Sequence, residues 1–167
     1  MPNQNCRVQA LDRSSAVVCA GTLGELHALI FTEPWSTGDI ARFTNHSSCQ
    51  GFVSYVDFEK PVGLALLRHA AGEGEILTFG VLPAFRRTGV GDALLTEILD
   101  WSIRADLEAL YLEVCEANVA AQLLYRKHGF HYSYRRKQYY RVRSGTPKDA
   151  VVLVRKLGVT NLNSTNC

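Results

Sequence analysis

The chain has 167 residues, of which 47% are apolar, 10% aromatic and 20% charged, a composition that indicates one globular domain and excludes a disordered or collagen-like protein. The net charge is only +2, which is too small for a protein that coats nucleic acid by bulk electrostatics. The longest apolar runs reach about six residues, whereas a helix needs roughly 20 to cross a bilayer, so a transmembrane helix is excluded.

The cysteines predict reduced thiols and no metal centre. All five are dispersed along the chain, without CxxC or Cys/His ligand spacing, at Cys6, Cys19, Cys49, Cys115 and Cys167. An odd and scattered set of this kind does not indicate a disulfide framework or a zinc site. The apolar run at Ala16–Ala20 is too short for a secretory signal, so we expect a cytoplasmic protein.

The first half of the chain predicts one strand, two helices and a run of strands. Weak alternation predicts a strand at Arg7–Leu11, and Thr22-Leu23-Gly24-Glu25 resembles a capping box that would begin a helix ending before Pro34. Ser36 can cap a short second helix. Turn residues then separate three expected strands, at Gly51–Phe58, Pro61–Arg68 and Glu75–Leu82.

The second half predicts a long helix and a strand, then a short helix and two strands. The long helix carries its buried side at Leu94, Leu95, Ile98, Leu99, Ser102 and Ile103. A strand is expected at Leu110–Val114, followed by a helix that Asn118 caps and Gly129 ends. Two last strands are expected near Phe130–Lys137 and Asp149–Arg155.

This order of elements predicts an α/β (α+β) fold. We expect a mostly antiparallel mixed sheet of about seven strands with four helices, placed on both of its faces. The domain would extend over residues 1–158, followed by a polar tail at 159–167.

A basic, glycine-containing turn at Arg86–Asp92 leads from an expected strand straight into the long helix. Glycines at alternate positions let backbone N–H groups point into the turn, and a helix N-terminus adds about half a positive charge, so such a turn can bind a pyrophosphate. Its spacing is neither GxxxxGK[ST] nor GxGxxG, which argues against a nucleotide triphosphatase or a dinucleotide fold. The alternative is a plain strand-to-helix turn that exposes Arg86 and Arg87.

Motifs spread over about residues 31–157 resemble the GNAT superfamily of acetyl-CoA-dependent N-acetyltransferases. They are Arg86-x-x-Gly89-x-Gly91, Leu112-Glu113-Val114, Asn118-x-x-Ala121 and Leu124-Tyr125-x-x-x-Gly129-Phe130. Further segments resemble the RimI branch, which acetylates the N-terminal alanine of a small-subunit ribosomal protein: Glu33-Pro34-Trp35-Ser36, Tyr139-Tyr140 and Asp149-Ala150.

The resemblance implies that the fourth and fifth strands splay apart and that acetyl-CoA, without a metal, occupies the gap. The residues that would contact the acetyl-pantetheine arm through their backbones are Phe79, Gly80 and Val81. Those that would hold the pyrophosphate are Arg86, Arg87, Thr88, Gly89, Val90, Gly91 and Asp92. Asn118 would also hydrogen-bond the cofactor, a role compatible with a plain N-cap.

The chemistry needs a base, because an amine must be neutral to attack a thioester. Strand alternation places Glu113 on the face opposite Leu112 and Val114, and the resemblance makes Glu113 the general base. The resemblance also makes Tyr125 the general acid that protonates the leaving thiolate. The alternatives are that Glu113 is a solvated carboxylate and that Tyr125 is a core aromatic residue. Cys115 shares the face of Glu113, but we expect a structural thiol there, because the family transfers acetyl directly.

The basic and aromatic segment 135–143 is either a rim of the substrate groove, an RNA surface or a solvated hairpin. The resemblance makes Tyr139 and Tyr140 substrate-binding residues and a ribosomal protein's N-terminal peptide the partner. Trp35 is a candidate substrate-binding residue, as a wall of the groove, or else a core residue. The resemblance is compatible with association with the ribosome. We expect no direct binding to nucleic acid or to a membrane. Two rival functions stay open: an acetyltransferase for a lysine, polyamine or other small amine, and a binding module without activity.

Overall fold

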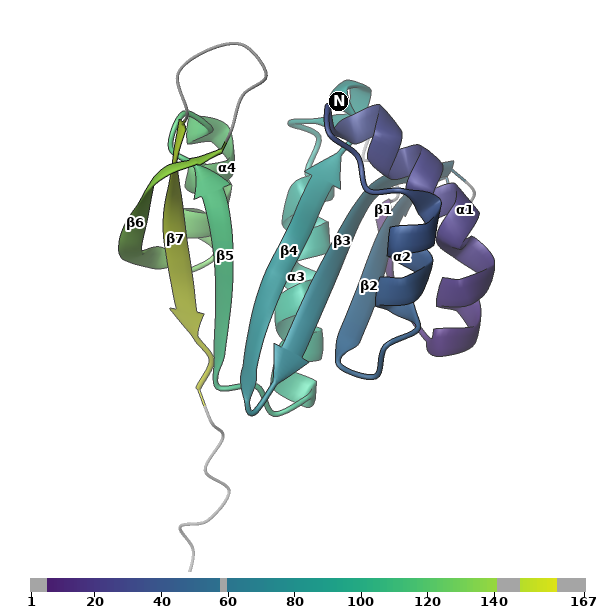
Figure 1. Cartoon of the computed structure of the whole chain (residues 1–167), viewed down its shortest axis with the longest axis horizontal. Coiled ribbons are helices and arrows are strands. Elements are labelled where there is room, and N and C mark those ends of the chain that lie inside the picture. Colours follow the sequence, from purple (N-terminus) through teal and green to yellow (C-terminus); the bar gives the residue numbers. More distant parts are fainter. Residues whose placement is uncertain (1–5, 58–59, 141–147, 159–167) are drawn as a thin grey trace, which may run out of the picture.

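The computed structural model describes residues 6–57, 60–140 and 148–158 (Figure 1). Its elements are β1 (Cys6–Leu11), α1 (Arg13–Ile30), α2 (Thr37–Thr44), β2 (Cys49–Val56), β3 (Lys60–Ala70), β4 (Glu73–Val81), a 3-10 turn (Pro83–Phe85), α3 (Val90–Arg104), β5 (Ala109–Cys115), α4 (Val119–Lys127), β6 (His131–Tyr140) and β7 (Lys148–Lys156). The predicted order of strands and helices is confirmed.

The described strands form one seven-stranded sheet in the order β1-β2-β3-β4-β5-β7-β6. Neighbouring strands are antiparallel except β4 and β5, which run parallel. Because a parallel pair needs a crossover connection, α3 returns the chain from the end of β4 to the start of β5. The prediction of a mostly antiparallel mixed sheet is confirmed.

The sheet opens between β4 and β5, as the resemblance implied. Pairing joins Glu73–Ile76 of β4 to Ala109–Leu112 of β5, and no further pair is formed in the described structure. A register shift between β3 and β4 falls at Leu66/Leu67, whose partners are Thr78 and Ile76, so Leu77 is an extra residue in β4. An irregularity of this kind bends a strand. Figure 1 shows the two strands diverging above this point.

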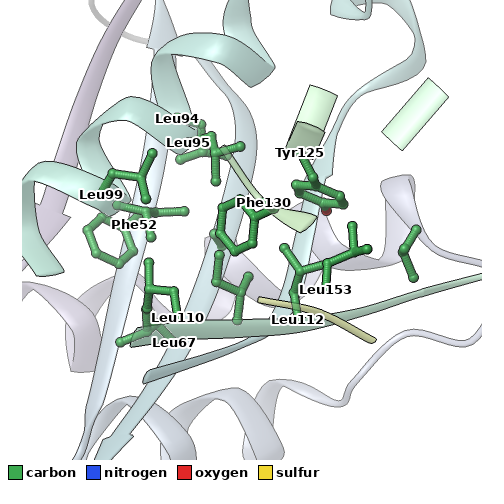
Figure 2. Packing of buried hydrophobic residues seen from close by; sticks show 14 of the residues in the cluster. Phe52, Leu67, Leu94, Leu95, Leu99, Leu110, Leu112, Tyr125, Phe130 and Leu153 are labelled. Carbon is green, nitrogen blue, oxygen red and sulfur yellow. The ribbon is translucent and has the colours of Figure 1, made fainter. Parts of the chain in front are cut away.

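Helices cover both faces of the sheet. On one face, α3 packs Leu94, Leu95, Ile98 and Leu99 into a core that also holds Tyr125 of α4 and Phe130 (Figure 2). On the other face, α1 and α2 bury Leu23, Leu26 and Ile40 against β2 and β3. The predicted stripe of α3 is confirmed except at its end, where Ile103 is 43% exposed.

The predicted start of the first helix is wrong. It begins at Arg13 rather than near Thr22, because the Asp12 side chain caps it by accepting a hydrogen bond from the Ser15 amide at 2.7 Å. The apparent capping box lies inside the helix. At Gly24 a Cβ would lie 2.5 Å from Thr37 Oγ1. Because glycine has no Cβ, α2 can approach α1 closely at this position.

The remaining sequence-level expectations concern thiols, metals and membranes. The four cysteines that the structure describes are free thiols, at Cys6, Cys19, Cys49 and Cys115. Among the described residues no group of His, Cys, Asp and Glu side chains is arranged to hold a metal ion. No described helix combines the length and apolarity that crossing a bilayer requires.

Candidate active site

The turn between β4 and α3 combines two left-handed residues with a helix N-terminus that no described side chain caps. Arg87 and Gly89 both adopt left-handed conformations, with φ of 64° and 93°. Gly89 is the N-cap of α3, and no described side chain caps the helix there. The first N–H groups of α3 are therefore available to a ligand, and the helix dipole adds partial positive charge.

Two side chains of this turn brace it from within. The Arg86 Nε donates a hydrogen bond to the Val81 carbonyl at 3.0 Å, and the Thr88 hydroxyl donates to the Phe85 carbonyl at 2.7 Å. Gly91 lies beside α4, where a Cβ would come 3.3 Å from Leu124. The structure thus ties the turn to the end of β4 and sets it close to α4.

The carboxylate of Asp92 bridges α3 and α4. It accepts hydrogen bonds from Lys127 Nζ at 2.5 Å and from His128 Nε2 at 3.1 Å. Burial acts to raise the pKa of Asp92, but the bonds from Lys127 and His128 outweigh it and hold the pKa below its ordinary value. Since its side chain is engaged, Asp92 could contact a pyrophosphate only through its backbone.

Glu113 faces away from the α3–α4 core, as strand alternation predicts. Leu112 and Val114 are buried in that core, whereas the Glu113 side chain is 17% exposed and its carboxylate forms an ion pair with Arg136 of β6. Glu113 also lines a cleft of about 320 Å³ together with Arg68, Glu73, Glu75 and Tyr111.

Tyr125 lies on the opposite face of β5 and is buried. Its ring makes edge contacts with the rings of Phe79 and Phe130, at 5.8 Å and 5.9 Å between centroids. Figure 2 shows Tyr125 beside Phe130. Phe79 belongs to β4 and Tyr125 follows β5, so their contact spans the two diverging arms of the sheet. Gly80 and Val81 lie in the same part of β4, beyond the last residue paired with β5.

Trp35 lies in the loop between α1 and α2. Its ring stacks on His27 at 6.0 Å and meets Phe43 edge-on at 5.7 Å. Trp35 also lines a second cavity, of about 590 Å³, together with Leu77 and Arg68. Arg68 lines the 320 Å³ cleft as well. Trp35 therefore packs in the fold and also forms a cavity wall.

Two sequence predictions have different outcomes at this site. The side chain of Asn118 accepts a hydrogen bond from the Ala121 amide at 3.2 Å, which confirms the N-cap; its contact with a cofactor stays a prediction. Tyr139 and Tyr140 belong to β6, but their side chains lie outside the described residues, so their role also stays a prediction.

The site holds residues that sequence reasoning missed. His27 was given no role, although it is 2% exposed and lies under Trp35. The sequence places Arg136 only within the basic and aromatic segment 135–143, whereas in the structure it pairs with Glu113. The basic character of segment 135–143 was the one available signal for Arg136, and no local pattern distinguishes His27.

Comparisons with known proteins identify the family. The family model described as the acetyltransferase (GNAT) family matches residues 21–130. The chain is 36% identical to the N-alpha-acetyltransferase RimI of Mycobacterium tuberculosis over 140 residues, 81% of this chain and 84% of that protein. It is 30% identical to the ribosomal protein bS18-alanine N-acetyltransferase of Escherichia coli over 125 residues, 72% and 79% of the two chains.

The fold is shared with solved structures. The crystal structure of the ribosomal-protein-S18-alanine N-acetyltransferase from Escherichia coli superposes with a TM-score of 0.83 at 22% identity, covering 96% of this chain and 99% of that one. The sequence motifs, the splayed sheet and these matches agree. The chain is an acetyltransferase that belongs to the GNAT family.

Proposed function

We propose that this acetyltransferase acetylates the N-terminal α-amine of a protein beginning with alanine, with a small-subunit ribosomal protein as the expected acceptor. The names of its relatives from Mycobacterium tuberculosis and Escherichia coli support this acceptor class. The observation that carries the proposal is the two-sided site. Glu113 and Trp35 lie on one side of the split sheet, and the glycine turn and Tyr125 lie on the other.

Acetyl-CoA is the co-substrate of this family and supplies an activated acetyl thioester when bound. The left-handed turn and the uncapped N–H groups of α3 fit a pyrophosphate. We assign the pyrophosphate to the backbone of residues 86–92. We assign the acetyl-pantetheine arm to residues 79–81, which pair with β3 but not with β5. We also assign a hydrogen bond to the cofactor to Asn118, the N-cap residue of α4.

Glu113 is the proposed general base. It would accept the proton that the acceptor amine must lose, directly or through one water molecule. The ion pair with Arg136 holds its carboxylate at the wall of the 320 Å³ cleft. The base thus faces the side of the sheet from which an acceptor can enter, away from the α3–α4 core.

Tyr125 is the proposed general acid. Its ring is fixed between Phe79 and Phe130, on the opposite side of β5 from Glu113. It would donate its phenolic proton to the departing thiolate, whose conjugate thiol has a pKa near 8.5. Separating the two proton carriers in this way lets Glu113 take the proton of the attacking amine while Tyr125 protonates the thiolate as the C–S bond breaks.

An α-amine suits this base better than a lysine amine. At pH 7 about 10% of an α-amine of pKa near 8 is neutral, against well under about 0.1% of a lysine amine of pKa about 10.4. A single carboxylate with moderate assistance therefore suffices for the α-amine. Trp35, with Tyr139 and Tyr140 from β6, is proposed to hold the first residues of the acceptor peptide.

An initial-rate assay with acetyl-CoA tests the proposal. The acceptors are a peptide beginning with Ala, the same peptide with its N-terminus blocked, and spermidine as a small polyamine. We expect acetylation of the free peptide and none of the blocked one. If spermidine is acetylated and the free peptide is not, the acceptor class is wrong while the family assignment stands.

A further inference from the structure

His27 of α1 uses both ring nitrogens inside the protein. The Trp35 backbone N–H donates to Nδ1 at 3.2 Å, and Nε2 lies 3.2 Å from the Thr78 hydroxyl. Because a backbone amide can only donate, Nδ1 is the acceptor and the neutral ring carries its proton on Nε2. Nε2 then donates to Thr78, so the geometry selects one tautomer.

The surroundings of His27 favour this neutral form. The residue is 2% exposed, and burial lowers the pKa of its imidazole. A doubly protonated ring would have no lone pair for the Trp35 amide.

The imidazole joins three segments that meet at the split in the sheet. Trp35 belongs to the α1–α2 loop and lines the 590 Å³ cavity, and Thr78 lies in β4 beside Leu77, which lines the same cavity. On its other side Thr78 adjoins Phe79, which contacts Tyr125. His27 therefore links a cavity wall to the strand that borders the gap.

Close packing supports this link. The Phe31 ring lies 4.3 Å from the His27 ring, and a Cβ on Gly80 would come within 2.5 Å of Ile30 and 2.8 Å of Phe31. The end of α1 thus lies directly on β4. The two hydrogen bonds of His27 extend this contact to the loop that carries Trp35.

We propose that His27 is a positioning residue that fixes Trp35, as a wall of the acceptor cavity, relative to the β4 segment at the split in the sheet. The acceptor cavity is the 590 Å³ cavity that Trp35 lines, since the proposed function, on which this inference rests, assigns Trp35 to the acceptor peptide. His27 itself touches neither acceptor nor acetyl-CoA. Its loss should therefore weaken acceptor binding and leave acetyl-CoA binding intact.

Three variants separate the two hydrogen bonds from the ring. His27→Phe keeps an aromatic ring and loses both bonds, His27→Asn keeps an acceptor near the Nδ1 position, and Thr78→Val removes the β4 partner. We expect the acceptor KM of His27→Phe to rise about tenfold, the scale of one or two lost hydrogen bonds, with an unchanged KM for acetyl-CoA. His27→Asn should recover part of the loss.

His131→Phe, at an exposed histidine of β6, is the matched control and should behave as wild type. Amide hydrogen exchange at Trp35 provides a readout that needs no activity. Exchange should be faster in His27→Phe and close to wild type in His27→Asn. If His27→Phe does not fold, Thr78→Val carries the test: it should raise the acceptor KM and leave the KM for acetyl-CoA unchanged, and an unchanged acceptor KM would overturn the role of His27.

The outcomes keep the two proposals distinct. An unchanged Trp35 exchange rate in folded His27→Phe, or equal rises in both KM values, overturns the role of His27. Failure of the wild-type protein to acetylate the Ala peptide overturns the proposed function and leaves the exchange test of His27 valid.

Discussion

Glu113 is the residue on which the proposed chemistry depends most. Glu113→Gln keeps the shape of the side chain and an oxygen for Arg136 but cannot accept the proton. We expect kcat to fall by about 10²–10⁴-fold, the usual contribution of a general base. Acetyl-CoA affinity, measured by calorimetry, should stay at the wild-type value, because Glu113 faces away from the α3–α4 side.

The control for this variant is Glu116→Gln, at a nearby carboxylate that is 49% exposed and paired with Arg135. Its kcat should be close to that of the wild type. A folded Glu113→Gln protein with wild-type kcat over pH 6 to 9 would show that Glu113 is structural.

Tyr125→Phe tests the proposed acid. The substitution keeps the ring between Phe79 and Phe130 and removes only the hydroxyl. We expect a lower kcat because the thiolate then leaves without a proton donor. The control is Tyr132→Phe on β6, where the side chain is 60% exposed. Equal rates for the two variants would contradict the assignment.

At the residue scale, the sequence predicts what depends on neighbours in the chain. Alternation along β5 placed Glu113 correctly, and a local pattern identified the cap at Asn118. The contacts that sequence reasoning missed join distant positions: His27 and Thr78 are 51 residues apart, Glu113 and Arg136 are 23, and Asp92 and His128 are 36. Such pairs depend on the assembled sheet and helices.

The turn before α3 offers a test at the scale of a structural element. At Gly89 a Cβ would have nothing within 4 Å, so a substitution there is resisted by the φ of 93° and not by a clash. A β-branched residue is strained in this conformation. We expect Gly89→Val to distort the turn and to abolish measurable acetyl-CoA binding in calorimetry.

Gly21→Ala is the matched control, because Gly21 lies within α1 and also has nothing within 4 Å of an added Cβ. There the substitution should increase the free energy of unfolding by up to about 1 kcal/mol and leave acetyl-CoA binding unchanged. Wild-type affinity in folded Gly89→Val would contradict the role of the turn.

The Asp92 bridge between α3 and α4 predicts a pH dependence of stability. Its pKa is lowered in the folded protein, so the bridge stabilises the fold above the ordinary carboxyl pKa and loses this effect as pH falls. Because the side chain is 38% exposed, the effect should stay below about 1 kcal/mol.

Urea unfolding of the wild type and of Asp92→Asn measures this dependence. The wild type should be more stable at pH 7, and the difference should shrink below about pH 4 and vanish at lower pH. A difference that stays constant from pH 7 to pH 3 would mean that ionisation of Asp92 contributes nothing.

At the element scale, the order of strands and helices follows from periodicity and turn residues, whereas element ends depend on tertiary contacts. The capping-box pattern at Thr22 suggests a helix start, but it lies inside α1. Gly24 is part of this pattern, and its lack of a Cβ leaves room for Thr37 of α2. The split between β4 and β5 could be predicted only from the family resemblance. The extra residue at Leu77 has no distinguishing sequence pattern.

At the scale of the whole molecule, the split sheet has helices on both of its faces. The glycine turn, α3 and α4 lie on one face, and α1, α2 and the two cavities bordered by Arg68 lie on the other (Figure 1). Pairing between β4 and β5 stops at Ile76 and Leu112, and we propose that the acetyl group is transferred where the two strands diverge. This arrangement leads us to expect acetyl-CoA and the acceptor to approach from opposite sides.

We propose that the acceptor is an N-terminal α-amine, and a single peptide distinguishes this acceptor from a lysine side chain. The peptide begins with Ala, contains one internal Lys, and is incubated with the protein and acetyl-CoA at pH 7 before fragmentation by tandem mass spectrometry. We expect the acetyl group on the α-nitrogen of Ala. Acetyl groups on the Lys side chain, with none on the N-terminus, would contradict it.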